Sequence, residues 1–143
     1  PRFWMEENRI RLVVDINVLF SAILCEGKDA ELLFDKKLDL SAPDYLMEEL
    51  RRLMPTISAR TNRTYQDVER MASMLSSEVK VVPSSETAAF LNAAKALSPD
   101  PDDAPYFALA LKTGAAIWSN DKLLKEQIVV KVYSTYEVGL LGT

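Results

Sequence analysis

Acidic and small polar side chains follow two strongly apolar stretches of this 143-residue sequence. Asp15 ends an unbroken apolar run, with Asn17 two positions later, and Ser119 and Asp121 follow a second run near the C-terminus. Taken singly, each of these side chains is explained by an ordinary role as a loop residue or helix N-cap. Asp15 is expected to lie deep, however, and a buried carboxylate is costly unless it has hydrogen-bonding partners or a cation.

Two adjacent glutamates can be separated by helical geometry. The segment 43–54 has the periodicity of a helix with one apolar face. That face consists of Leu46, Leu50, Leu53 and Met54. At about 100° per residue, Glu48 lies nearly opposite this face and Glu49 lies at its edge. We expect Glu48 to be solvated and Glu49 to lean toward the core, the alternative for Glu49 being an exposed salt bridge to Arg52.

Three more carboxylates, on Asp100, Asp102 and Asp103, crowd ahead of an apolar helix predicted at 103–113. Capping and the helix dipole explain one of them, most simply Asp102. Asp103 shares a helical face with Phe107 and is expected to point inward at the mouth of a buried helix. Capping does not explain all three acids, and Asp100 has no assigned role.

Composition removes several kinds of chemistry. The chain has no histidine, which excludes Ser-His-Asp and Cys-His catalysis and the common zinc sites. Its four glycines form no phosphate-binding loop, and its single cysteine, Cys25, cannot form an internal disulfide. No stretch approaches the length of a membrane span. We expect one domain over 1–143, soluble and cytoplasmic, and any nucleic-acid binding must use a local basic patch because the net charge is −4.

Strand-like and helix-like segments alternate along the chain. Strands are predicted at 10–16, 79–82, 115–119 and 128–133, with a short apolar patch at 38–42, and helices at 17–25, 29–36, 43–54, 84–97 and 103–113. A basic connector at 55–63 leads to a further helix that Thr64 is expected to cap, and a short helical piece is predicted at 121–125. This alternation indicates a layered α/β fold with a central parallel sheet.

In such folds, ligands bind beyond the carboxyl ends of the strands. Asp15, Glu49, Asp103 and Asp121 come from four separate elements, and each is expected near this edge. Carboxylates held close together repel one another unless a cation lies between them. Oxygen ligands without histidine or cysteine favour Mg²⁺ or Mn²⁺, and phosphodiester hydrolysis is the usual work of such a centre.

The chain resembles the PIN-domain nucleases, in particular the compact prokaryotic group that includes VapC-type toxins. The stretches that carry the resemblance are "LVVDINVL", "LMEELRRL", "DDAPYFALA" and "IWSNDKLL", in the order of the family and over almost the whole chain. The resemblance implies a three-layer α/β/α, Rossmann-like fold and a Mg²⁺- or Mn²⁺-dependent endoribonuclease. It also implies a homodimer and, for a toxin, an antitoxin partner.

The family's functional positions carry over residue by residue. Those that match its acids are Asp15, Glu49, Asp103 and Asp121, and those that match its supporting polar positions are Asn17 and Ser119. Ile16 departs from the pattern, since the family often has a hydroxyl residue there. The extra acids Asp100 and Asp102 leave the third acidic position open, and Glu48 competes with Glu49.

The RNA-binding surface is less visible in the sequence. Arg51, Arg52 and Lys122 are candidate RNA contacts, and an ordinary solvated charge mix is the alternative. A PIN-fold protein without activity, serving as an RNA-binding or assembly module, is the competing function. A receiver-like or phosphatase-like protein fits poorly, because Asn17 replaces the second phosphatase aspartate and Lys131 lies inside its predicted strand.

Overall fold

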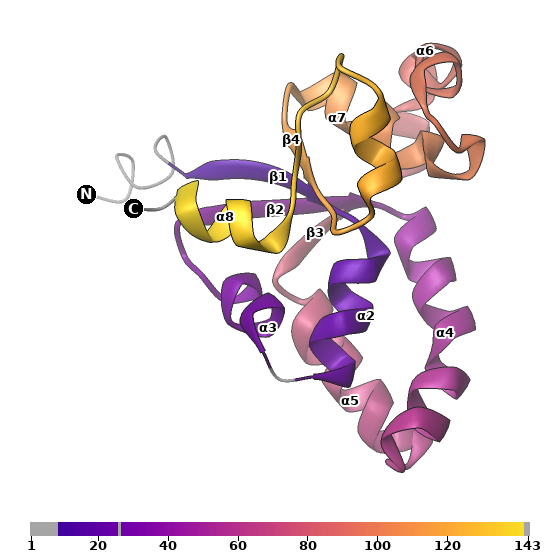
Figure 1. Ribbon diagram of the computed structural model, residues 1–143. Helices are drawn as coiled ribbons and strands as arrows, with labels where there is room; N and C mark the ends of the chain where they lie inside the picture. Colours follow the sequence, from indigo (N-terminus) through magenta and orange to yellow (C-terminus); the bar gives the residue numbers. More distant parts are fainter. Residues whose placement is uncertain (1–8, 26, 142–143) are drawn as a thin grey trace.

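The computed structural model describes residues 9–25 and 27–141 of the chain (Figure 1). Its centre is a parallel sheet with the strand order β3-β2-β1-β4-β5. The strands are β1 (Ile10–Val14), β2 (Leu38–Pro43), β3 (Val79–Val82), β4 (Ala116–Trp118) and β5 (Val132–Tyr133). The chain moves from β1 outward to β3 and then returns to the other side of β1. The order of the strands therefore reverses between β1 and β4, which makes their carboxyl ends the expected position of a ligand.

Helices cover both faces of the sheet, which confirms the predicted three-layer α/β/α fold. The α-helices are α2 (Ile16–Leu24), α3 (Lys28–Leu33), α4 (Tyr45–Thr61), α5 (Tyr65–Ser76), α6 (Leu91–Leu97), α7 (Ala104–Thr113) and α8 (Thr135–Leu141). The 3₁₀ turns are η1 (Ser84–Glu86), η2 (Ala88–Phe90), η3 (Pro101–Asp103) and η4 (Lys122–Glu126). In Figure 1, α2 to α5 lie on one side of the sheet, while α6 and α7 lie on the other, with α7 packed across β1, β2 and β4.

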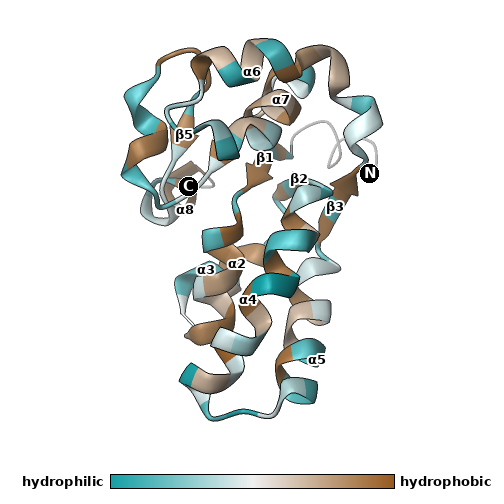
Figure 2. Cartoon of the chain, turned by 90° about the vertical axis from the view of Figure 1, so that its right-hand side faces the viewer, coloured by the Kyte–Doolittle hydropathy of each residue, from teal (hydrophilic) through white to brown (hydrophobic). Residues whose placement is uncertain are grey.

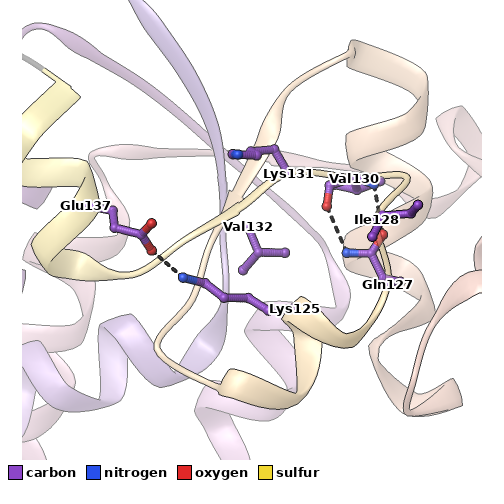
Figure 3. Close-up of a pocket in the computed structure, with 7 residues that line it drawn as sticks. All are labelled: Lys125, Gln127, Ile128, Val130, Lys131, Val132 and Glu137. Carbon is purple, nitrogen blue, oxygen red and sulfur yellow. Dashed lines mark hydrogen bonds and ion pairs between the residues drawn. The ribbon is translucent and has the colours of Figure 1, made fainter.

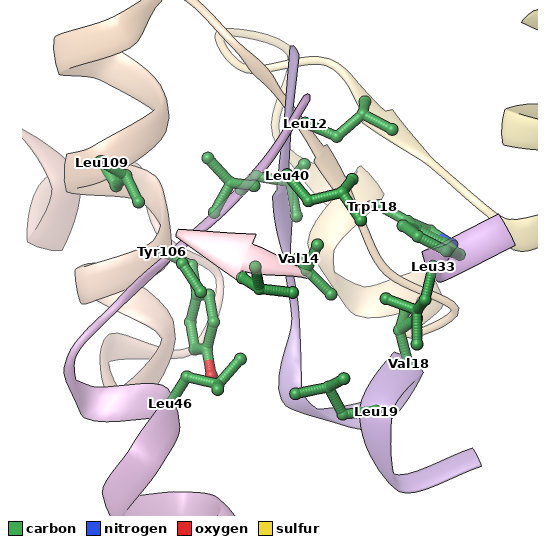
Figure 4. Packing of buried hydrophobic residues seen from close by; sticks show 14 of the residues in the cluster. Leu12, Val14, Val18, Leu19, Leu33, Leu40, Leu46, Tyr106, Leu109 and Trp118 are labelled. Carbon is green, nitrogen blue, oxygen red and sulfur yellow. The ribbon is translucent and has the colours of Figure 1, made fainter. Parts of the chain in front are cut away.

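Burial follows the sequence pattern closely. Val13 and Val14 of β1 and Phe107 and Leu109 of α7 have no exposed surface, because these elements form the middle of the molecule. Figure 4 shows Val14 and Leu109 within this packing. The outer helices α4 and α5 show both hydrophobic and hydrophilic segments in Figure 2, as amphipathic helices do. Within residues 9–25 and 27–141, no helix combines the length and the apolar character needed to cross a lipid bilayer.

Helix α4 is longer than predicted. It continues through Pro55 to Thr61, so the expectation of a basic connector at 55–63 is wrong for most of that segment. The reason is burial: Ile57 has no exposed surface and extends the apolar face beyond the proline. This packing offsets the loss of one backbone hydrogen bond at Pro55. The helix ends where Asn62 adopts a left-handed conformation at φ 56°.

The segment 84–97 is α-helical only from Leu91 onward, so the predicted helix is too long by two turns. Ser84–Phe90 instead forms η1 and η2. Side chains compete for the backbone there, since Asp44 Oδ2 accepts from the Ser84 N–H at 3.1 Å and Thr87 Oγ1 donates to the Ser84 carbonyl at 3.3 Å. Such local bonds offer the chain an alternative to the helix.

The predicted strand 128–133 pairs with β4 only at its last two residues. Gln127 is the physical reason, because its side-chain amide bonds to the Leu124 carbonyl and to both backbone groups of Val130 at 2.8–2.9 Å. These bonds hold a loop on which Ile128 is 98% exposed. Helix α8, which packs beside α3 and β5, was not predicted.

Candidate metal centre at the carboxyl edge of the sheet

Asp15 and Ser119 lie next to each other at the carboxyl ends of β1 and β4. Val14 and Trp118 are paired in the sheet, so the residue after each strand reaches the same edge. Asp15 is only 5% exposed and Ser119 only 1%. The Ser119 hydroxyl donates to Asp15 Oδ2 at 2.7 Å. The sequence expectation that Asp15 would lie deep is therefore confirmed.

Asn17 and Asp121 complete this hydrogen-bond network. Asn17 Nδ2 donates to Asp15 Oδ2 at 2.9 Å and to Ser119 Oγ at 3.1 Å. The Asp121 N–H donates to the same Ser119 Oγ at 3.1 Å. The Asp121 side chain is exposed, and it caps η4 by accepting from the Leu123 N–H at 3.0 Å. The start of α2, after β1, and the start of η4, after β4, are thereby linked by hydrogen bonds to the buried carboxylate of Asp15.

Glu48 and Glu49 point in different directions, as the helical geometry of α4 predicts. Glu48 is exposed and lies 3.7 Å from Arg52, so the alternative salt bridge belongs to Glu48. Glu49 is half-buried, and its Oε1 accepts a 2.5 Å hydrogen bond from the hydroxyl of Tyr106 in α7. Tyr106 links the helix that carries Glu49 to the helix that begins after Asp103.

Asp103 is the half-buried residue directly before α7. The capping assignment to Asp102 is wrong: Asp100 Oδ1 accepts from the Asp102 N–H at 3.0 Å and caps η3. Asp100 can do this because Pro101 follows it and occupies the first position of the turn. Asp100, which had no assigned role, is therefore the cap of η3, and Asp102 is exposed. Asp103 makes no capping hydrogen bond and lies within the electrostatic influence of Asp15, Glu49 and Asp121.

The four carboxylates repel one another electrostatically. Burial raises the pKa of Asp15, and the charge of Asp121 adds to this effect, although the Ser119 hydrogen bond opposes it. Burial also raises the pKa of Glu49, and Asp15 contributes. The pKa of Asp103 rises to about 7 through burial and the charges of Asp15, Asp100, Glu49 and Asp121. One negative electrostatic field is therefore shared by the four acids Asp15, Glu49, Asp103 and Asp121.

Arg52 offsets part of this negative field, because its charge opposes the rise in the pKa of Glu49. Among the residues that the structure describes, the salt bridges do not involve Asp15, Glu49, Asp103 or Asp121. Within the same residues, no three acidic or cysteine side chains lie close enough together to enclose a metal ion by themselves. Mg²⁺ in proteins commonly takes only one or two carboxylates and completes its shell with waters and substrate phosphates. An acidic, oxygen-only donor set of this kind fits such a cation.

A comparison with protein-family models identifies the family. Residues 13–139 match the model described as "PIN domain". The chain belongs to the PIN-domain family. Proteins of this family are nucleases, and the match spans every element that carries one of the four acids. A search of the curated proteins found no match.

Solved structures with the same fold as this PIN domain include three prokaryotic proteins. VapBC2 from Rickettsia felis, bound to a DNA fragment from its promoter, has 12% identity and a TM-score of 0.68 over 87% of this chain and 98% of that chain. A toxin-antitoxin complex from Klebsiella pneumoniae has 16% identity and a TM-score of 0.64 over 88% and 98%. PAE2754 from Pyrobaculum aerophilum has 18% identity and a TM-score of 0.62 over 94% and 91%.

The predicted basic residues lie close to two of the acids in the sequence, since Arg51 and Arg52 follow Glu49 by two and three positions. Arg51 and Lys122 are exposed, and Lys122 directly follows Asp121. Arg52 stacks over the Tyr45 ring at 5.7 Å and neighbours Glu48, so part of its role is structural. A surface pocket between η4, β5 and α8, lined by Lys125, Lys131 and Glu137 among others, contains none of the four acids (Figure 3).

Sequence reasoning missed two residues that support the PIN-domain site. Tyr106 is absent from the predicted site residues, although its position one helical turn after Asp103 places it on the same face of α7. Thr135 was not considered. It accepts hydrogen bonds from Trp118 Nε1 and Asn120 Nδ2 and bonds to Asp29, which holds α8 and α3 against the loop after β4. No local pattern in the sequence indicates these contacts of Thr135.

Proposed function

We propose that this PIN domain is a Mg²⁺- or Mn²⁺-dependent endoribonuclease. The observation that carries the proposal is the field shared by Asp15, Glu49, Asp103 and Asp121 at the edge where the strand order reverses. Four acids on four elements, with no salt bridge to any of them among the described residues, repel one another, and a cation between them would relieve this repulsion. Because the chain belongs to a nuclease family, we infer that the cation serves phosphodiester hydrolysis.

One or two of the four acids would ligate the ion directly and the others would bind it through its waters, with Asp15 deepest and Asp121 at the solvent side. When bound, Mg²⁺ or Mn²⁺ polarises a phosphoryl oxygen and activates a water for attack on phosphorus. Asn17 and Ser119 donate to the same oxygen of Asp15 and fix the direction of its carboxylate. Arg51 and Lys122, which are exposed, would contact RNA phosphates, and Arg52 would do so less, because Glu48 is already its neighbour.

We infer further that the protein is the toxin of a toxin–antitoxin pair in the cytoplasm. Two of the similar structures are described as VapBC2 and as a toxin-antitoxin complex, and this chain covers 98% of each of those chains. The proposed partners are an antitoxin chain and a second copy of this protein. A short open reading frame next to the gene, whose product co-purifies with this chain, is the expected observation, and size-exclusion chromatography with light scattering measures the homodimer.

The direct test is cleavage of a mixed RNA pool by the purified protein, with Mn²⁺, with Mg²⁺ and with excess chelator, followed by sequencing of the fragment ends. We expect cleavage at defined positions only when a metal is present. Cleavage that persists in chelator would contradict the metal dependence. RNA binding without cleavage in both metals would favour the alternative of an inactive RNA-binding or assembly module.

A further inference from the structure

We propose that Tyr106 is a positioning residue of the metal centre, acting through Glu49. The inference rests on the proposed function and concerns one hydrogen bond. The phenol of Tyr106 donates to Glu49 Oε1 at 2.5 Å across 57 positions of sequence. The hydrogen bond fixes one carboxylate oxygen of Glu49. Because the carboxylate group is rigid, the direction of its other oxygen is fixed as well.

The tyrosine is held rigidly enough to act as a fixed donor. It is 1% exposed, and its ring meets Tyr45 edge-on at a centroid distance of 6.5 Å and an interplanar angle of 68°. In Figure 4 its hydroxyl end points toward α4 beside Leu46, which lies three residues before Glu49. A buried aromatic ring of this kind cannot turn away without disrupting the core.

The choice of donor suits a cation site. A lysine or arginine at this place would neutralise Glu49 and compete with the metal, whereas a phenol supplies a hydrogen bond without positive charge. Tyr106 also stands in the first turn of α7, three residues after Asp103. A single side chain thus couples the positions of two proposed ligands that come from different helices. Residues that orient ligands in this way commonly change metal affinity about 10- to 100-fold when they are lost.

The experiment measures Mn²⁺ binding to the full chain without RNA, by isothermal titration and by the electron paramagnetic resonance signal of free Mn²⁺. Tyr106→Phe keeps the ring and removes only the hydroxyl, and we expect Mn²⁺ affinity to fall about tenfold. Tyr65→Phe is the matched control, because its hydroxyl lies near the Met54 sulfur at 4.0 Å, away from the acids. We expect its Mn²⁺ affinity to equal that of the wild type.

A double-mutant cycle separates positioning from a general effect on the fold. In a Glu49→Gln background, Tyr106→Phe should cause no further loss of Mn²⁺ affinity, since the group through which it acts is gone. Equal losses in both backgrounds, or an unchanged affinity in Tyr106→Phe, would overturn the role of Tyr106 while leaving the proposed nuclease intact. Failure of the wild-type protein to bind Mn²⁺ would overturn both.

Discussion

The hydroxyl of Ser119 donates to Asp15 Oδ2 at 2.7 Å, although the two residues are 104 positions apart. The contact exists because β1 and β4 are neighbours at the centre of the sheet and end in register. Both side chains are buried, and the carboxylate of Asp15 is oriented by the neutral donors Ser119 and Asn17.

Asp15→Asn should abolish metal-dependent RNA cleavage while preserving the fold. The asparagine can still accept from Ser119 but cannot supply a charge to the metal. We expect a loss of activity greater than the roughly 10- to 100-fold typical of supporting residues. Cleavage assays and thermal melts of the same preparations measure this, and an active Asp15→Asn protein would refute the assignment of this residue.

Glu49→Gln should reduce cleavage far more than Glu48→Gln. Glu49 faces Tyr106 and the other acids, whereas Glu48 is exposed and lies near Arg52. The two variants remove the same charge from adjacent positions of one helix, so each is the control for the other. The comparison requires initial rates at saturating Mn²⁺, and the reverse order of activities would contradict the assignment of helical faces.

Ser119→Ala should destabilise the metal-free protein by about 1–3 kcal/mol, because it leaves buried polar partners around Asp15 unsatisfied. Ser76→Ala is the matched control, since Ser76 is only partly buried and its hydroxyl donates to the Ser73 carbonyl of its own helix at 3.3 Å. It should change stability by less than about 0.5 kcal/mol. Urea unfolding in chelator measures both variants, and equal effects would show that the Ser119 network contributes nothing special.

The metal-free protein should lose stability as the pH rises from about 4 to about 7. The pKa of Asp103 is raised from 3.8 to about 7 in the folded state, so the folded state binds the proton more tightly than the unfolded state across this window. Deprotonation therefore costs stability as the pH increases. Asp103→Asn should flatten this slope and stabilise the protein at neutral pH. Thermal melts in chelator between pH 4 and pH 8 measure it, and an unchanged slope in the variant would contradict the prediction.

Arg51→Ala and Lys122→Ala should weaken RNA binding by removing phosphate contacts. Each should reduce the dependence of log affinity on log salt by about 0.7 to 1, as expected for one lost contact. Lys95→Ala on α6 is the control, because it removes an exposed lysine from an element that carries none of the four acids. Filter-binding titrations measure this in an Asp15→Asn background, which prevents cleavage of the RNA. If the slope of log affinity against log salt in either variant equals that of Lys95→Ala, that residue does not contact the RNA.

Local patterns in the sequence were sufficient for the main features of the fold and for much of the candidate site. The β-branched run before Asp15 predicts a central strand, and helical angles alone separate Glu48 from Glu49. These predictions succeed because the period of a helix or strand decides which side chains face inward. The same periods could not predict that α4 passes through Pro55, because the burial of Ile57 against other elements decides it.

The sequence by itself thus determined the order of the elements, the depth of Asp15 and the faces of α4. The structure was needed to show that Asp100 caps η3 in place of Asp102, and only the tertiary structure decided that Tyr106 bonds to Glu49. The first depends on the local path of a proline-containing turn, where several aspartates are equally good caps by type. The second depends on the packing of α7 and α4 around the sheet, which places residues 57 positions apart within hydrogen-bonding distance, and no short-range pattern encodes that contact.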